Sequence, residues 1–269
     1  METGNYVTRS NGMHNDLPFR IIARLDVKTG HVIKGVQLEG LRKVGIPEIM
    51  AKHYYEHGAD ELLFMDAVAS LYDRNHLASL LETTAHDVFI PLSVGGGVRS
   101  IEDAKHLFGS GADKICVNTA AIARPSFITD LAREFGSQSV VASIEAKKLE
   151  SADGWEALYK CGREKADLEV LRWAKDLAEL GAGELLVTSI DREGTRQGFD
   201  LELYSSLREC VDIPIIASGG MGNIDHIATL YETGVDAVAI ADHLHFGRSK
   251  VSELKGALIS KGIPVRLSV

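Results

Sequence analysis

IPLSVGGG at residues 90–97 returns as IPIIASGG at residues 213–220, so one pattern, an apolar run that ends in glycines, occurs twice in the chain. The same offset relates the ELL motif at 61–63 to the ELL motif at 184–186. The chain therefore consists of two equivalent halves. Two four-stranded halves close most simply into one eight-stranded barrel, whereas a doubly wound sheet gives no reason for such a repeat.

Apolar runs with the length and continuity of strands that are covered on both faces recur along the chain. They lie at residues 20–27, 61–67, 90–97, 114–118, 139–146, 184–190, 213–220 and 237–241. Amphipathic segments typical of helices separate most of these runs, and several end in glycine, the usual residue after a helix. The sequence predicts a single (β/α)8 barrel over residues 19–269, near the roughly 250 residues typical of that fold. Residues 1–18 are polar, lie outside the repeat and are expected to form a disordered extension.

The composition excludes several classes of protein. Apolar residues make up 45% and charged residues 25% of the 269 residues, as in a soluble globular protein. A net charge of -9 argues against nucleic acid or an anionic membrane as a partner. No apolar run approaches the ~20 residues that span a bilayer. The cysteines are too few for a disulfide framework, which favours the cytoplasm: Cys116, Cys161 and Cys210.

Two acidic residues end equivalent strands of the two halves, and the active site of this fold lies at that end of the barrel. Asp26 follows the first run and Glu145 the fifth, so they are expected to face each other across the barrel mouth. A general acid and a general base require this arrangement. The alternative is structural, because a carboxylate at a strand end also caps a helix or pairs with a lysine.

Both glycine-rich strand ends lead directly into helices. Gly96-Gly97 and Gly219-Gly220 would expose backbone N–H groups at a helix N-terminus, which suits a phosphate. A tight turn between strand and helix is the simpler explanation of either cluster alone. Two clusters at equivalent positions favour a ligand with a phosphate at each end. Asn118-Thr119 and the loop at 190–198 supply further polar groups near them.

Charged residues also begin several strands and would meet at the bottom of the barrel. Two are cations and two are anions, which permits a closed ring of ion pairs: Arg20, Glu61, Lys114 and Glu184. The structural interpretation is a capped barrel floor; the functional one is a gate through which something small enters from below.

Other features of the sequence carry less information. GWEALYKCG, in the irregular stretch 149–169, is compatible with a hairpin over the mouth, either as a lid or as packing. The histidines and cysteines show no metal-ligand spacing, so neither a metal nor another cofactor is expected. No cysteine has the context of a nucleophile.

Taken in order, several motifs resemble the cyclase subunit of imidazole glycerol phosphate synthase. They include RIIARLDVKTGHVIKG (20–35), IPLSVGGGVRS (90–100), GAGELLVTSIDREGT (181–195) and IPIIASGG (213–220), and the resemblance extends over about residues 19–269. It implies a heterodimer with a glutaminase that docks at the N-terminal face of the barrel. Ammonia from the glutaminase then enters through the charged gate and reaches a phosphorylated ligand, a ribulosyl-aminoimidazole-carboxamide nucleotide, at the top.

The resemblance also implies roles for particular residues in a histidine-biosynthesis lyase. Asp26 and Glu145 are the expected acid–base pair, while the four residues at the barrel floor match the ammonia gate. The ligand would be cleaved and cyclised to imidazole glycerol phosphate and an aminoimidazole-carboxamide ribotide. The expected substrate- and phosphate-binding residues are Lys34, Gly96, Gly97, Asn118, Thr119, Asp191, Gly194, Thr195, Ser218, Gly219, Gly220 and Asp242.

Departures from the family pattern cluster at the substrate face. Glu145 and Glu193 replace aspartates, so each keeps its carboxyl group but moves it by about one methylene. A displacement of a catalytic group near 1 Å can cost about 10²-fold in rate. Asp242 replaces a small hydroxyl residue and would repel a phosphate unless it is paired or turned away. Arg24 replaces a small residue and is expected to point away from Asp26 or to pair with a nearby acid. Arg24 and Asp242 are also candidates to compensate each other across the seam between the first and last strands.

These departures leave two alternatives open. One is a relative that delivers ammonia for amidine formation on a surface-polysaccharide sugar. The other is a catalytically silent barrel that serves as a binding partner of the glutaminase. The presence of Asp26 and of both glycine turns argues against a silent barrel.

Overall fold

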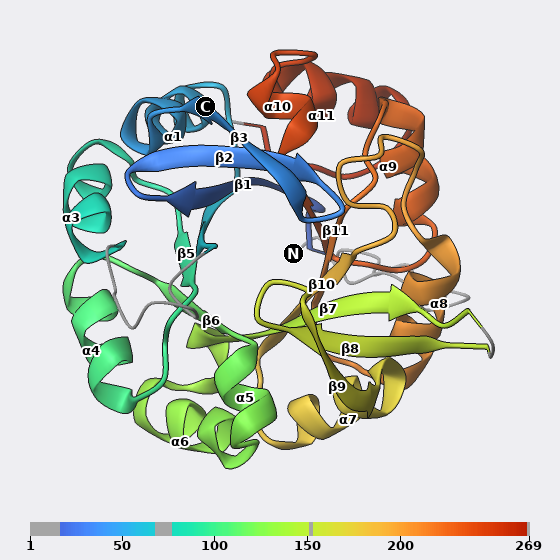
Figure 1. Cartoon of the computed structure of the whole chain (residues 1–269). Helices are drawn as coiled ribbons and strands as arrows, with labels where there is room; N and C mark the ends of the chain where they lie inside the picture. Colours follow the sequence, from blue (N-terminus) through green and yellow to red (C-terminus); the bar gives the residue numbers. More distant parts are fainter. Residues whose placement is uncertain (1–16, 68–76, 151–152, 268–269) are drawn as a thin grey trace, which may run out of the picture.

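Eight parallel strands form a closed barrel in the part of the chain that the computed structural model describes, residues 17–67, 77–150 and 153–267. Figure 1 shows them as an inner ring surrounded by helices. In order around the ring they are β1 (Arg20–Lys28), β4 (Glu61–Asp66), β5 (Leu92–Gly95), β6 (Lys114–Val117), β7 (Val140–Lys148), β10 (Glu184–Ser189), β11 (Ile215–Ser218) and β12 (Ala237–Ile240). Pairing of β12 with β1 closes the ring, so the predicted (β/α)8 barrel is confirmed.

Helices cover the outside of the barrel, with a large apolar core between them and the strands. Local signals define several of them. Ser100 accepts the N–H of Asp103 at 3.0 Å while the Asp103 carboxylate accepts the N–H of Ser100, a capping box that begins α4. The helices are α1 (Pro47–Glu56), α3 (Leu77–Asp87), α4 (Ile101–Gly109), α5 (Thr119–Ala123), α6 (Ser126–Phe135), the 3-10 turn η1 (Ser137–Ser139), α7 (Val170–Glu179), α8 (Leu201–Cys210), α9 (Ile224–Tyr231), α10 (Asp242–His245) and α11 (Val251–Ser260).

Two antiparallel hairpins interrupt the alternation of strand and helix. The first consists of β2 (His31–Val36) and β3 (Glu39–Gly45) and extends β1; the second consists of β8 (Trp155–Tyr159) and β9 (Glu164–Glu169) and extends β7. β1 and β7 begin the two halves, so the repeat includes the hairpins. The second hairpin confirms the interpretation of GWEALYKCG. Its strand β9 occupies residues 164–169, inside the stretch that was expected to be irregular, and α7 begins at Val170.

Each hairpin covers the glycine turn of the opposite half. Gln37, in the turn between β2 and β3, donates its N–H to the carbonyl of Glu193 at 2.8 Å, beside Gly219-Gly220. Lys160, in the turn between β8 and β9, donates its N–H to Thr119 Oγ1 at 3.2 Å, beside Gly96-Gly97. The two halves are therefore interlocked at the top of the barrel.

A layer of apolar side chains fills the middle of the barrel. Its buried members come from seven of the eight barrel strands: Ile22, Leu63, Cys116, Val141, Leu186, Ile216, Ala237 and Ala239. Such layers of inward-pointing side chains are usual in this fold. The layer separates a polar floor at the strand N-termini from a polar mouth at their carboxyl ends.

The predicted extension, residues 1–18, lies mostly outside the described residues. Leu17 and Pro18 are described, and the N–H of Phe19 bonds to the carbonyl of Pro264 at 2.7 Å. This contact joins the start of β1 to the segment after α11. No helix among the described residues is long and apolar enough to cross a bilayer.

Candidate active site

Asp26 and Glu145 lie at the barrel mouth, at the ends of the equivalent strands β1 and β7. The charge of Asp26 acts on Glu145, and both carboxylates act on Arg24, which places the three groups close together. Glu145 Oε2 accepts the N–H of Gly162 from the turn between β8 and β9 at 2.7 Å. The expected pair of carboxylates therefore shares one site, with the hairpin above it.

Burial raises the pKa of Glu145 to about 7, although the hydrogen bond from Gly162 and the charge of Arg24 oppose the rise. The neighbouring charge of Asp26 adds to it. A carboxyl group with this pKa exists in both protonation states near neutral pH. It is suited to donate a proton in one step and accept one in another.

Arg24 lies inside the mouth and is buried, with 6% of its surface exposed. Its Nε donates to Asp26 Oδ1 at 2.9 Å. The expectation that Arg24 pairs with a nearby acid is confirmed, whereas compensation between Arg24 and Asp242 is wrong. Asp242 instead lies near two other cations, with Oδ1 3.5 Å from Arg248 Nη2 and 3.9 Å from Arg196 Nε. Both Arg24 and Asp26 point inward because residues two apart on a strand share a face.

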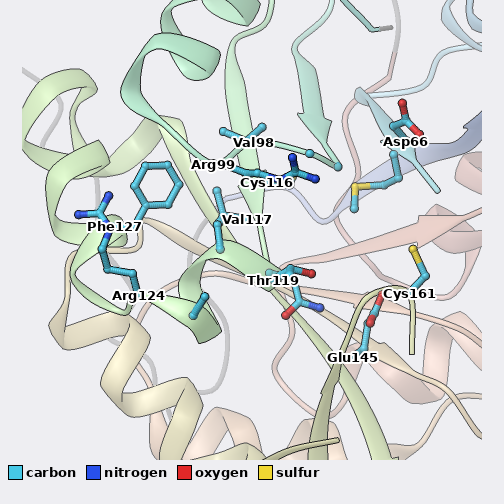
Figure 2. Close-up of a pocket in the computed structure, with 16 residues that line it drawn as sticks. Asp66, Val98, Arg99, Cys116, Val117, Thr119, Arg124, Phe127, Glu145 and Cys161 are labelled. Atoms are coloured by element: carbon cyan, nitrogen blue, oxygen red, sulfur yellow. The ribbon is translucent and has the colours of Figure 1, made fainter. Parts of the chain in front are cut away.

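The first glycine turn, Gly96-Gly97, borders a cavity of about 330 Å³. Both glycines have positive φ, and a Cβ on Gly96 would lie 2.4 Å from the carbonyl oxygen of Asp66, so a side chain does not fit there. Figure 2 shows this cavity with Thr119, Arg124 and Glu145 around it. The arginine gives this end a cation that suits a phosphate.

Asn118 and Thr119 are brought together with the first glycine turn, as predicted. Asn118 Nδ2 donates to the carbonyl of Leu158 at 3.2 Å, which holds the hairpin over the cavity. Its Oδ1 is buried and has no hydrogen-bond partner in the structure. A buried acceptor without a partner is costly and is expected to receive a bond from a ligand.

The second glycine turn, Gly219-Gly220, borders a space of only about 20 Å³. One water molecule needs ~10–15 Å³ by this measure, so a phosphate does not fit without rearrangement. Six of the residues that were expected to bind substrate or phosphate line this space: Lys34, Gly194, Ser218, Gly219, Gly220 and Asp242. Lys34 is ion-paired with Glu193, and both are buried.

Two expected ligand-binding residues lie outside both glycine turns. Asp191 Oδ1 pairs with Lys147 Nζ at 2.5 Å, and its Oδ2 accepts the N–H of Lys148 at 2.8 Å. Thr195 Oγ1 donates to the carbonyl of Arg192 at 2.7 Å and closes its own loop. Their side chains therefore stabilise the β10–α8 loop.

The floor of the barrel carries the predicted ring of ion pairs. Lys114 Nζ lies 2.9 Å from Glu61 and 2.9 Å from Glu184, and Arg20 pairs with the same two carboxylates, with Glu61 at 3.1 Å. Burial lowers the pKa of Lys114, but the charges of Glu184 and Glu61 outweigh it, and the net pKa lies above its ordinary value. Both cations therefore stay charged. A cavity of about 480 Å³ lies below the ring.

Sequence reasoning missed the groups that the β8–β9 hairpin brings to the site. The N–H of Gly162 bonds to Glu145, and Cys161 borders the first cavity. No local signal identifies them, since the contacts depend on how the hairpin folds over the mouth. Among the residues that the structure places, no three His, Cys, Asp or Glu side chains are grouped as metal ligands.

The closed parallel barrel, its repeated halves and the polar mouth define a duplicated (β/α)8 barrel with its site at the carboxyl ends of the strands. The chain belongs to the family of histidine biosynthesis proteins, whose family model matches residues 20–250.

Two relatives are similar over most of their length. One is the imidazole glycerol phosphate synthase subunit HisF of Legionella pneumophila, 55% identical over 206 residues, which cover 77% of this chain and 97% of the relative. The other is the imidazole glycerol phosphate synthase subunit HisF of Mycobacteroides abscessus, 46% identical over 252 residues, which cover 92% of this chain and 98% of the relative. The word subunit in both names implies that these relatives work with a partner.

Proposed function

We propose that the chain is the ammonia-dependent cyclase subunit of a glutamine amidotransferase. It converts the ribulosyl-aminoimidazole-carboxamide nucleotide to imidazole glycerol phosphate and an aminoimidazole-carboxamide ribotide, a lyase reaction. One observation carries the proposal: a single barrel has a closed ring of four charged residues at its floor and two carboxylates at its mouth. The first suits controlled entry of a small molecule, and the second suits proton transfer.

The chemistry follows from the carboxylate pair. Ammonia that replaces the ligand's carbonyl oxygen must lose two protons while the oxygen leaves as water, and the cleavage that accompanies ring closure breaks a C–N bond whose departing nitrogen needs a proton. Asp26 and Glu145 supply a proton acceptor and a proton donor at one site. The glycine turns bind the phosphates at the two ends of the ligand, with Lys34 and Asn118 as further contacts.

The glutaminase partner is proposed to dock at the N-terminal face. The cavity of about 480 Å³ lies at that face, next to Arg20 and Lys114. Leu17, which lines it, is 72% exposed and offers apolar surface to a partner. With the described cysteines free, we place the complex in the cytoplasm.

The purified chain is expected to turn over the nucleotide when ammonium salts replace the glutaminase, because the mouth carries both proton-transfer groups. Release of the two products is followed by chromatography. The proposal fails if no product forms while the chain still binds a glutaminase and stimulates it.

A sugar acceptor remains the second candidate because of one observation. Asp242 Oδ1 is buried beside the second glycine turn, and no described residue hydrogen-bonds to it, although Arg248 Nη2 lies 3.5 Å away. A carboxylate there favours a hydrogen-bond donor, such as a hydroxyl or amino group, over a phosphate. The same ammonium assay with an amino sugar nucleotide discriminates the two acceptors.

Asp242→Ser is expected to lower KM for the histidine-pathway nucleotide about 10-fold, with kcat changed less. The reason is repulsion: two charges 4 Å apart near a protein surface cost up to ~4 kcal/mol, and Arg196 and Arg248 become free to face the phosphate. Steady-state kinetics with ammonium salts give both constants. Asp87→Ser, on the exposed surface of α3, removes the same charge far from the mouth and serves as control. An unchanged or higher KM for Asp242→Ser would favour the acceptor without a second phosphate.

A further inference from the structure

Arg24 is a buried guanidinium that joins three barrel strands. Its Nε bonds to Asp26 on β1 at 2.9 Å, and its Nη1 donates to Thr188 Oγ1 on β10 at 2.8 Å and to Ser218 Oγ on β11 at 3.1 Å. Thr188 and Ser218 are each 1% exposed. These hydroxyls hold the guanidinium in one position, since a buried cation without partners would be strongly destabilising.

The surroundings keep Arg24 charged. Burial alone would lower its pKa, but the charges of Asp26 and Glu193, the hydrogen bond to Asp26 and the charge of Glu145 raise it above its ordinary value. Arg24 is therefore a permanent cation among three carboxylates.

The two reacting carboxylates are in different environments as a result. Asp26 is bonded directly to the guanidinium. Glu145 is bonded to the backbone N–H of Gly162, and burial brings its pKa to about 7. Groups whose environments differ in this way take different parts in proton transfer.

We propose that Arg24 is a positioning residue that divides these parts: it holds Asp26 as the carboxylate that accepts a proton and leaves Glu145 to donate one. Ammonia adds to the ligand's carbonyl carbon, a C–N bond forms, and one proton passes from the nitrogen to the oxygen. As the C–O bond then breaks, Asp26 takes a second proton from the nitrogen and Glu145 gives its proton to the oxygen, which leaves as water. When the ring closes and the C–N bond to the ribotide breaks, Asp26 returns its proton to the departing nitrogen and Glu145 regains one from the ring nitrogen. The inference rests on the proposed function, because it assigns roles within that reaction.

The charge on Arg24 also acts on Glu145 and lowers its pKa. A proton donor works below its pKa, so activity is lost as the pH rises through that value. Removal of the cation raises the pKa of Glu145 and moves the alkaline limb of the pH–rate profile to higher pH. Three groups act directly on Glu145: Arg24 and Asp26 from β1 and the Gly162 N–H from the hairpin. The other titratable or charged groups that line its cavity are Asp66, Arg99, Cys116, Arg124 and Cys161.

Arg24→Met tests the inference, since it keeps an unbranched apolar stem and removes the charge. With ammonium salts and the nucleotide, kcat is expected to fall about 10²-fold and KM to change less than about 3-fold. The alkaline limb of the pH–rate profile is expected to move to higher pH. Arg24→Lys restores the charge without the fork of donors. It is expected to bring the alkaline limb back to its wild-type pH and to restore part of kcat.

Arg208→Met is the matched control. Arg208 also bonds a carboxylate, Asp236, and two carbonyls, but it lies on α8 near the opposite end of the barrel. Arg208→Met is expected to have the same pH–rate profile as the wild type. The inference is overturned if Arg24→Met loses kcat with an unmoved alkaline limb, if it gains activity, or if Arg24→Lys behaves as Arg24→Met.

A second measurement needs no turnover. Carboxyl ¹³C NMR, assigned with Glu145→Gln, follows the titration of Glu145 in wild type and in Arg24→Met. If the nucleotide is not turned over but the titration of Glu145 moves upward in the variant, the proposed reaction fails and the effect of Arg24 on Glu145 stands. If turnover occurs and the titration does not move, the inference about Arg24 fails alone.

Discussion

Asp26→Asn is expected to lower kcat with ammonium salts by about 10³-fold, the largest effect of any single substitution in the chain. The amide cannot accept a proton, and general acid–base groups typically contribute 10²–10⁴-fold. Its Oδ1 still accepts the hydrogen bond from Arg24, which is 2.9 Å away in the structure, so the shape of the mouth is retained. KM for the nucleotide should therefore change little. Steady-state kinetics give both constants.

Asp87→Asn provides the control for Asp26→Asn, because it neutralises an exposed carboxylate on α3 that pairs with the surface groups Lys52 and His86. This variant should keep wild-type turnover. If Asp26→Asn retains more than about a tenth of wild-type kcat, Asp26 does not transfer the proton. A silent barrel predicts that the same variant leaves every property unchanged, including stimulation of the glutaminase.

Lys114→Glu is expected to reduce glutamine-dependent turnover of the complex about 10²-fold and to affect turnover with free ammonium salts much less. The new carboxylate would lie beside Glu61 and Glu184, both within 2.9 Å of Lys114 Nζ in the structure, so the ring would break at the proposed entry point for ammonia from the partner. Free ammonia can reach the mouth from solvent. The ratio of glutamine-dependent to ammonium-dependent turnover, measured on one preparation, separates an effect at the barrel floor from an effect on the reaction at the mouth.

The ammonium-dependent rate also reports whether Lys114→Glu is folded, since breaking a buried ion pair costs about 3–5 kcal/mol. Lys105→Glu, on the exposed surface of α4, makes the same reversal of charge away from the ring. Equal losses in both assays for Lys114→Glu would show that the ring only stabilises the barrel floor.

The barrel was predictable because its signals are long and repeated. Continuous apolar runs marked the eight barrel strands, and the constant offset between the halves selected a closed barrel. The first hairpin, β2 to β3, was missed for a local reason. Its two turn residues, Gln37 and Leu38, have φ of 50° and 64°, a conformation for which glycine, asparagine or aspartate is the usual signal.

The site was predictable in position and less so in contacts. Location at a strand end was enough to choose Asp26 and Glu145, because this fold gathers those ends at one face. The partner of Arg24 was not decided by sequence, since Asp26 and Asp242 were both within the range of a long side chain. In the structure, hydrogen bonds to Thr188 and Ser218 hold the Arg24 guanidinium inside the barrel, where its partner is Asp26.

The two ends of the mouth differ in size, and this has a kinetic consequence for a ligand with two phosphates. The cavity at Gly96-Gly97 is open, at about 330 Å³, whereas the space at Gly219-Gly220 is about 20 Å³ and is bordered by the Lys34–Glu193 ion pair. One phosphate can enter at once, but the other must first separate that pair. For such a ligand we expect sequential capture: a fast encounter at the first turn, followed by a slower, unimolecular closure in which Lys34 exchanges Glu193 for the second phosphate.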